Sequence, residues 1–160
     1  MSVRPNAFQK LLHRFFMLRS VTAFFAPWIH QLDHAILKLT KGKYTATEIL
    51  GWNIIQLITI GAKTNQPRSL PLVGLFDGDK IALIASSFGR EHNLGWYYNL
   101  KKNPDCEVQR NGCSSKYLAH EAEGGERDKY WQLALSYYAG YEKYKERAVR
   151  KIPVIVLEPK

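Results

Sequence analysis

The chain has 160 residues, 46% of them hydrophobic and 23% charged, which is the size and composition of one folded domain with a hydrophobic core. Its formal net charge is +9, and residues 1–43 hold seven Lys or Arg and one Asp, so +6 of this excess lies there. No segment reaches the roughly 18 uninterrupted apolar residues of a membrane-spanning helix, and charges and Pro27 interrupt the N-terminal segment, so we expect no signal peptide.

The N-terminal segment has the pattern of a basic amphipathic helix. Apolar residues recur at the spacing of one helical face: Phe8, Leu11, Leu12, Phe15 and Phe16. Residues 6–25 are therefore expected to lie on an anionic membrane surface or to pack on their own domain, and the pattern fits both. Basic residues interleaved with large apolar ones argue against nucleic-acid binding. We assign residues 1–43 to this helical segment and residues 44–160 to a separate folded domain.

From residue 52 the pattern changes to that of strands, which are rich in β-branched residues and separated by turn signals. The predicted strands are residues 52–60, 69–76, 80–86, 106–110, 113–121 and 152–157. Helical patterns occupy residues 93–102 and 126–147, the second with an interruption at Gly140. Six strands with hairpin connections and inserted helices predict an α+β domain built on an antiparallel barrel.

The two cysteines flank a predicted two-residue hairpin turn at Asn111-Gly112. In that hairpin Arg110 faces Cys113, so Cys106 pairs with Tyr117 and the two sulfurs are too far apart for a disulfide. We expect two free thiols in a reducing compartment.

A basic turn, Gly61–Arg68, connects the first two predicted strands. It offers two cations, Lys63 and Arg68, together with the Thr64 hydroxyl and several backbone N–H groups. Turn amides form concave anion sites, and arginine adds bidentate geometry for phosphate. An ordinary solvated loop would show the same polarity. The turn is therefore our first candidate site, for a phosphorylated flavin-like cofactor.

Two further segments could contribute to such a site. Residues 85–92 run from a strand end into a predicted helix, whose N-terminus would suit phosphate or carboxylate, with Ser86 or Ser87 as hydrogen-bonding groups. Three tyrosines, Tyr138, Tyr141 and Tyr144, recur at helical spacing. Such rings usually belong to a core, but three phenols on one face also supply a wall for a planar ligand and a proton donor.

Metal binding is not expected. His30 and His34 have the i, i+4 spacing of a zinc helix, but the neighbouring acidic residue is in the wrong position and no third ligand is evident. The sequence also contains no Walker loop and no dinucleotide-binding glycine motif.

The order of these motifs resembles that of the deazaflavin (F420)-dependent nitroreductase family of split β-barrel flavin/deazaflavin oxidoreductases. Residues 57–72, which contain the basic turn, are similar to the family's segment TTGRKSGQPRxxPL. Further matches follow in the family's order: Asp77-Gly78, Ala85-Ser86, residues 96–100 with Asn103-Pro104, residues 138–141 and residues 150–159. Together the matches cover roughly residues 30–160.

The resemblance implies a six-stranded antiparallel split β-barrel that binds reduced coenzyme F420, an 8-hydroxy-5-deazaflavin with a phospholactyl-oligoglutamate tail. The implied reaction is hydride transfer to an electron-poor acceptor such as a quinone or a nitroaromatic compound. The residues implied to bind the cofactor are Lys63, Thr64, Gln66, Arg68, Pro71, Ala85, Ser86, Trp96 and Asn99. Those implied at the acceptor are Val73, Tyr138, Tyr141 and Tyr144, with Ser86, Tyr138 and Tyr141 as the catalytic groups.

The sequence departs from the family pattern in its basic residues. Ala62 replaces the first basic residue of the turn, Asn65 replaces a glycine, and Ser87 stands where another lysine is usual. Because two cations are missing, FMN is the alternative cofactor, and a non-catalytic lipid, fatty-acid or FMN-binding protein is the alternative function. We expect a cytoplasmic protein with a small-molecule acceptor, peripheral on the inner face of the cell membrane if residues 6–25 bind lipid. Homodimerisation is left open.

Overall fold

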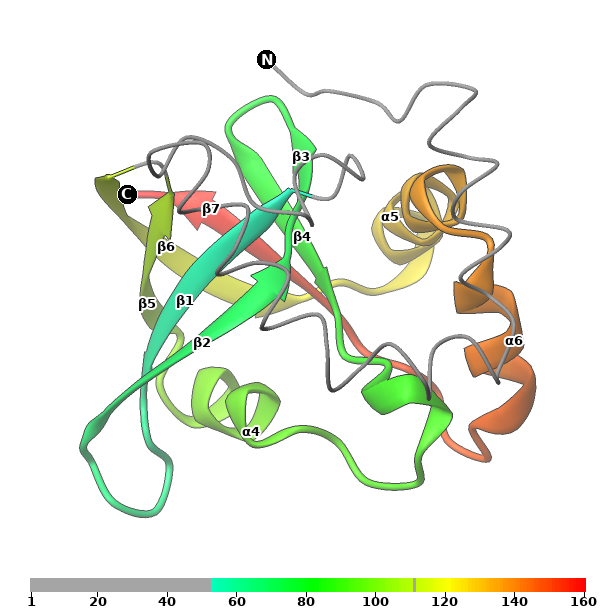
Figure 1. Cartoon of the computed structure of the whole chain (residues 1–160), viewed down its shortest axis with the longest axis horizontal. Coiled ribbons are helices and arrows are strands. Elements are labelled where there is room, and N and C mark those ends of the chain that lie inside the picture. Colours follow the sequence, from blue (N-terminus) through cyan, green and yellow to red (C-terminus); the bar gives the residue numbers. More distant parts are fainter. Residues whose placement is uncertain (1–52, 111) are drawn as a thin grey trace, which may run out of the picture. The chain divides into compact units, whose positions relative to one another are not determined.

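A computed structural model describes residues 53–110 and 112–160. The predicted N-terminal helical segment, with residues 6–25 and the histidine pair, lies outside these residues. The described part is one curled antiparallel sheet with the strand order β2-β1-β5-β6-β7-β4-β3, which closes only part of a barrel (Figure 1). Its strands are β1 (Ile54–Ile60), β2 (Pro67–Val73), β3 (Leu75–Asp77), β4 (Lys80–Ile84), β5 (Asp105–Arg110), β6 (Cys113–Glu121) and β7 (Val154–Pro159).

The sheet has seven strands, so the prediction of six was wrong at one place. The predicted single strand 69–76 is interrupted at Gly74: β2 pairs with β1, and β3 pairs with β4 at the opposite edge of the sheet. A Cβ atom at Gly74 would lie 3.1 Å from the Ile81 side chain and 3.2 Å from that of Ile55. The glycine therefore lets the backbone cross close to the interior while the chain changes pairing partner.

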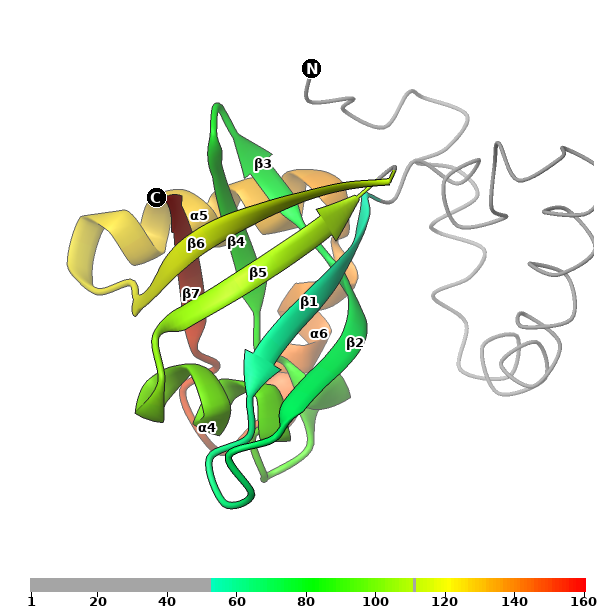
Figure 2. The ribbon, with the colours of Figure 1, turned by 90° about the vertical axis from the view of Figure 1, so that its left-hand side faces the viewer.

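The described residues also form four helical segments: η1 (Ser87–Gly89), α4 (Gly95–Lys102), α5 (Gly124–Tyr137) and α6 (Gly140–Arg147). The interruption predicted at Gly140 is confirmed, since α5 and α6 are separate helices on either side of it. α4 lies beside the β1–β2 turn at one end of the curled sheet, whereas α5 and α6 lie along one flank, as Figure 2 shows.

Two hydrophobic clusters lie on opposite faces of the central strands. The side chains that alternate along β1, with Ile55 and Leu57 buried, point into the curled sheet and pack against Trp96 and Leu100 of α4. Strands β4 and β7 are buried on both faces, because their other side chains pack against α5. In this second cluster Tyr130 is 1% exposed. α4 thus closes the interior, and α5 covers the flank.

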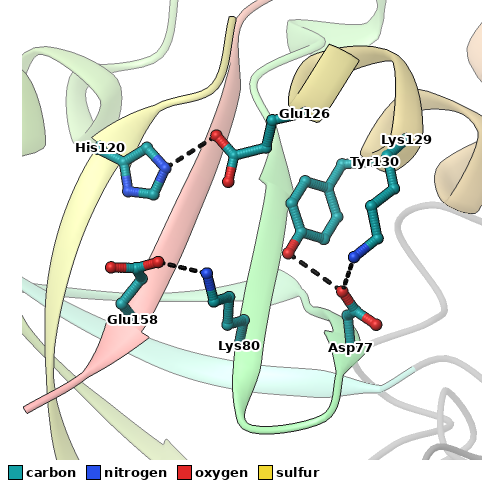
Figure 3. A network of polar contacts seen from close by, with 7 residues as sticks. All are labelled: Asp77, Lys80, His120, Glu126, Lys129, Tyr130 and Glu158. Atoms are coloured by element: carbon teal, nitrogen blue, oxygen red, sulfur yellow. Dashed lines mark hydrogen bonds and ion pairs between the residues drawn. The ribbon is translucent and has the colours of Figure 1, made fainter.

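A network of polar contacts joins α5 to the sheet far from α4 (Figure 3). Asp77, at the end of β3, accepts hydrogen bonds from Lys129 and from the buried Tyr130 hydroxyl. The Lys129 ammonium holds the pKa of Asp77 below its usual value. Lys80 pairs with Glu158 across β4 and β7. The cations and carboxylates here are already paired with one another, so we assign this network to stabilising the contact of α5 with the sheet and not to ligand binding.

The predicted hairpin register is confirmed. Arg110 faces Cys113, Cys106 faces Tyr117, and both cysteines are free thiols. Burial, with a smaller contribution from the Asp105 charge, raises the pKa of Cys106 to about 12, so this thiol stays protonated at neutral pH.

We expect an aromatic disulfide reagent to modify exposed Cys113 rapidly at pH 8 and Cys106 only after unfolding. The measurement is the stoichiometry of thiol release with and without denaturant. Two equally fast thiols in the native protein would contradict the burial of Cys106, and Cys113→Ser should remove the fast phase.

Candidate functional site

The basic turn between β1 and β2 is a closed loop with its own hydrogen bonds. The Gly61 N–H donates to the Gln66 carbonyl at 2.9 Å, and the Asn65 N–H donates to the Gly61 carbonyl at 2.9 Å. Asn65 has a φ of 51°, in the left-handed region that glycine and asparagine tolerate best. Asparagine therefore occupies the position of a family glycine with little cost to the turn.

Side chains of helix α4 hold this turn through hydrogen bonds to its backbone. The Ala62 N–H donates to Asn99 Oδ1 at 2.9 Å, and Asn99 Nδ2 donates to Thr59 Oγ1 at 3.0 Å. Lys102, one helical turn further, donates to the Ala62 carbonyl at 2.6 Å. Both backbone polar groups of Ala62 are thus bound by α4, which fixes the loop against the end of the sheet.

A groove of about 760 Å³ lies between the turn and α4. It is lined by Gly61, Ala62, Lys63, Thr64, Arg68, Ser69, Leu70, Asn93, Leu94, Gly95, Trp96, Tyr98 and Asn99. Lys63 and Arg68 are exposed, and neither forms an ion pair with a carboxylate among residues 53–110 and 112–160. No carboxylate of the described residues neutralises their positive charge, so the charge is left to attract an anionic ligand to the groove.

Two buried polar atoms of the groove residues also lack partners within the described part of the chain. They are the indole N–H of Trp96 and the side-chain oxygen of Asn93. Buried polar groups are normally hydrogen-bonded, so such atoms call for a ligand or ordered water. A groove with unpaired cations at one end and an aromatic side chain beside it fits a planar group that carries a phosphate.

The segment after β4 differs from the prediction. It was expected to run into a helix N-terminus, but it forms only the single 3₁₀ turn η1, and α4 begins six residues after that turn, at Gly95. Ala85 is fully buried and Ser86 half-buried. Ser87 is buried with a φ of 49°, so it presents no exposed group where the family has a lysine. The helix N-terminus predicted at this position is therefore replaced by a 3₁₀ turn.

The three tyrosines form one cluster at the junction of α5 and α6. Tyr138 lies 5.7 Å from Tyr141 and 6.1 Å from Tyr144, between ring centroids, and Tyr141 lies 6.0 Å from Tyr144. All three are half-buried. Burial raises the pKa of Tyr141 and of Tyr144, so both phenols are uncharged throughout the neutral range.

The structure brings part of the predicted site together. Five of the predicted cofactor residues line the groove: Lys63, Thr64, Arg68, Trp96 and Asn99. The other predicted residues lie outside its lining: Gln66, Pro71, Val73, Ala85, Ser86, Tyr138, Tyr141 and Tyr144. Val73 packs against the same hydrophobic cluster as Tyr141 and Tyr144, so the residues predicted at the acceptor border one region of the fold.

Three residues of this region were missed from the sequence. Asn93 lines the groove, Lys102 binds the turn, and Arg150 donates hydrogen bonds to the loop after β4. Only Lys102 had a usable signal, because residues three apart on a helix share a face and Lys102 follows Asn99 by three. Tertiary structure alone brings Asn93 to the groove and Arg150 to the loop after β4.

Among the described residues no group of three or more His, Cys, Asp or Glu side chains could hold a metal ion. The same residues contain no helix that is both long enough and apolar enough to cross a membrane.

The chain is similar to known proteins in sequence and in fold. The family model of the F420H(2)-dependent quinone reductase matches residues 30–159. An F420H(2)-dependent quinone reductase of Mycobacterium tuberculosis is 39% identical over 106 residues, which cover 63% of this chain and 70% of that protein.

Two solved structures are similar to the chain in fold and sequence. One, titled as an F420-H2 dependent reductase, has 36% identity and a TM-score of 0.61, and covers 66% of this chain and 93% of its own. A second, titled as a domain-swapped dimer, has 32% identity and a TM-score of 0.63. The match covers 83% of this chain and 98% of that one. The chain therefore belongs to the F420H(2)-dependent quinone reductase family, a family of oxidoreductases whose cofactor is coenzyme F420.

Proposed function

We propose that the chain binds reduced coenzyme F420 in the groove between the basic turn and α4 and uses it to reduce a quinone. The observation that carries this proposal is the pair of unpaired cations, Lys63 and Arg68, on a turn that α4 holds in place beside a groove of about 760 Å³. In this proposal Lys63, Thr64, Gln66, Arg68 and Pro71 would hold the phosphate and acidic tail. Trp96, Asn99, Ala85 and Ser86 would hold the ring.

The chain's own part in the reaction is to bind and orient. Because Asn99 and Lys102 occupy both backbone polar groups of Ala62, the turn is formed before the ligand arrives, and less ordering entropy is lost on binding. When bound, the reduced deazaflavin supplies a hydride, which together with one proton reduces a quinone to the hydroquinone. The protein thus has to align the two partners and provide that proton.

The tyrosine cluster is the proposed wall of the acceptor site, with Val73 beside it. Aromatic rings bind a planar quinone by stacking and edge contacts. The phenols of Tyr141 and Tyr144 are uncharged at neutral pH, so they carry the hydroxyl proton that a donor would pass on. Ser86, Tyr138 and Tyr141 are the proposed donors. Tyr141→Phe should therefore lower kcat more than it changes the affinity for coenzyme F420.

A direct test is to titrate the full chain with coenzyme F420 and with FMN, then to follow oxidation of the reduced deazaflavin by menadione. We expect saturable binding of coenzyme F420, weaker binding of FMN, and turnover that depends on the protein. Binding of neither compound, or binding that Lys63→Ala leaves unchanged, would contradict the proposal. The family assignment favours this enzyme over the non-catalytic binder considered as the alternative, because the named relatives are reductases.

Gly140 offers a test of the acceptor wall. A Cβ atom there would lie 2.2 to 2.5 Å from the end of the Tyr138 side chain, so Gly140→Ala forces that ring out of its present position. An aromatic contact between the ring and a planar acceptor is worth about 0.5–1.5 kcal/mol, so its loss should raise KM for menadione roughly twofold to tenfold with little change in cofactor affinity. The control is Gly125→Ala, where a Cβ meets nothing within 4 Å. Equal effects of both substitutions would contradict the assignment.

Action at the membrane surface and dimerisation are separate parts of the proposal. The +6 charge of residues 1–43 supports peripheral binding of a cytoplasmic reductase to anionic lipid, where lipid-soluble quinones are found. Co-sedimentation with anionic and with neutral vesicles, with and without residues 1–25, tests this, and binding unaffected by the deletion would refute it. A similar structure is titled as a domain-swapped dimer, which supports a homodimer that sedimentation equilibrium can detect.

A further inference from the structure

Arg150 donates hydrogen bonds to three backbone carbonyls of the loop that follows β4, residues 85–90. Arg150 Nη2 donates to the Ala85 carbonyl at 3.0 Å and to the Ser86 carbonyl at 3.3 Å. Its Nε donates to the Arg90 carbonyl at 3.1 Å. No carboxylate among the described residues pairs with this guanidinium. The side chain therefore uses its charge to hold both ends of the loop.

The loop needs such support because its backbone is strained. Ser87 has a φ of 49°, which is uncommon for a residue with a side chain, whereas the φ of 79° at Gly89 is one that glycine adopts freely. Within the loop, the Gly89 N–H donates a hydrogen bond to the Ser86 carbonyl at 2.9 Å, and the Arg90 N–H donates one to the Ser87 carbonyl at 3.1 Å. A strained conformation persists only where its surroundings fix it, and Arg150 is the polar group that does so across the loop.

The same loop touches the helix of the tyrosine cluster. A Cβ atom on Gly89 would lie 3.2 Å from the Tyr144 carbonyl oxygen and 3.0 Å from Arg147 Cβ, so loop and helix are in close backbone contact. Arg150 itself follows the end of α6 by three residues, and the Ala85 N–H donates to the Pro153 carbonyl at 3.0 Å. One chain segment thus joins the end of α6 to the loop after β4.

We propose that Arg150 is a positioning residue that sets the distance between the Ala85-Ser86 loop and the tyrosine cluster. This inference rests on the proposed function, in which the loop faces the deazaflavin ring and the tyrosines face the acceptor. Hydride transfer depends steeply on the separation of donor and acceptor, so loosening this connection slows the chemical step while leaving the basic turn intact. A lysine cannot replace the arginine. The planar guanidinium reaches the Ala85, Ser86 and Arg90 carbonyls at once through two nitrogens, and a single ammonium group cannot.

The first test compares the full-length chain with Arg150→Ala and Arg150→Lys, using coenzyme F420 and menadione. We expect kcat to fall by about tenfold or more in both variants, with cofactor affinity within about threefold of the parent. Guanidinium ions at low millimolar concentration should restore part of the activity of Arg150→Ala and leave Arg150→Lys unchanged. The matched control is Lys151→Ala, which removes one exposed positive charge from the adjacent position and should behave like the parent. Retention of kcat, or a loss that guanidinium does not reverse, would overturn the proposal.

The second test needs no turnover, so it separates this inference from the proposed function. In hydrogen exchange on the ligand-free chain, Arg150→Ala should speed exchange at the Gly89 and Arg90 amides and in α6, but not at the Gly61 and Asn65 amides of the basic turn. Unchanged exchange in the loop and α6 would refute the role of Arg150 even if the cofactor binds. If the parent chain fails to bind coenzyme F420 while the exchange pattern changes as expected, the proposed function fails and the structural connection stands.

Discussion

Replacement of Lys63 and Arg68 by alanine together should lower the affinity for coenzyme F420 by at least about a hundredfold. Each charge-assisted hydrogen bond contributes about 1.5–3 kcal/mol, so two contribute about 3–6 kcal/mol, and each 1.4 kcal/mol is a factor of ten. The loss should leave folding unchanged, because both side chains are exposed and form no ion pair with the described carboxylates. The measurement is a fluorescence titration of the deazaflavin at constant ionic strength.

A charge-matched control separates a local contact from general attraction. Lys143→Ala with Lys151→Ala removes the same two positive charges from exposed positions outside the groove lining. We expect this pair to change the affinity by less than about threefold, since separated surface charges are screened by salt. Similar losses in the two double variants would show that the turn acts only through net charge and would refute a specific phosphate site.

Substitution of Asn99 by leucine should destabilise the fold and weaken the site together. Leucine keeps the branched shape of asparagine at Cγ but leaves the Thr59 hydroxyl, on a residue 1% exposed, and the Ala62 N–H without their partner. An unsatisfied buried polar group costs about 1–3 kcal/mol and two groups lose their partner, so the free energy of unfolding should fall by about 2–6 kcal/mol. Urea denaturation measures this change, and the cofactor titration should show weaker binding because the turn is no longer held.

Two further variants separate these effects of Asn99. Thr59→Val combined with Asn99→Leu removes both partners of one hydrogen bond, so it should recover part of the lost stability. Asn99→Asp keeps an acceptor for the Ala62 N–H and should cost less stability, but it places a negative charge at the groove and should weaken cofactor binding strongly. Stability close to that of the parent in Asn99→Leu would contradict the role of this residue in holding the turn.

At Ala62, where the family has a basic residue, the structure places a lysine from α4 beside the turn. Lys102 donates to the Ala62 carbonyl, so a cation from α4 stands next to the position where the turn itself has none. Together with Asn65, whose φ of 51° suits asparagine, this means that two of the departures from the family pattern leave the geometry of the turn in place. The third, Ser87, is buried in the strained loop that Arg150 holds.

The sequence by itself determined the features that depend on near neighbours. Alternation of buried residues along β1, the basic turn after it, the Asn111-Gly112 hairpin register and the interruption at Gly140 all follow from local spacing and backbone preference. The order of several such motifs along the chain indicated the family, and the turn remains the predicted anion site.

Only the tertiary structure decided which distant residues meet. Whether residues 69–76 pair with one neighbour or two depends on how closely Ile55 and Ile81 approach Gly74, and local pattern carries no information on that distance. Likewise, Asn99 and Arg150 find their partners 37 and 64 or 65 residues away. A helix or strand pattern fixes the face on which a side chain lies, but the contacts that hold the turn and the loop arise when the sheet curls and brings its ends together.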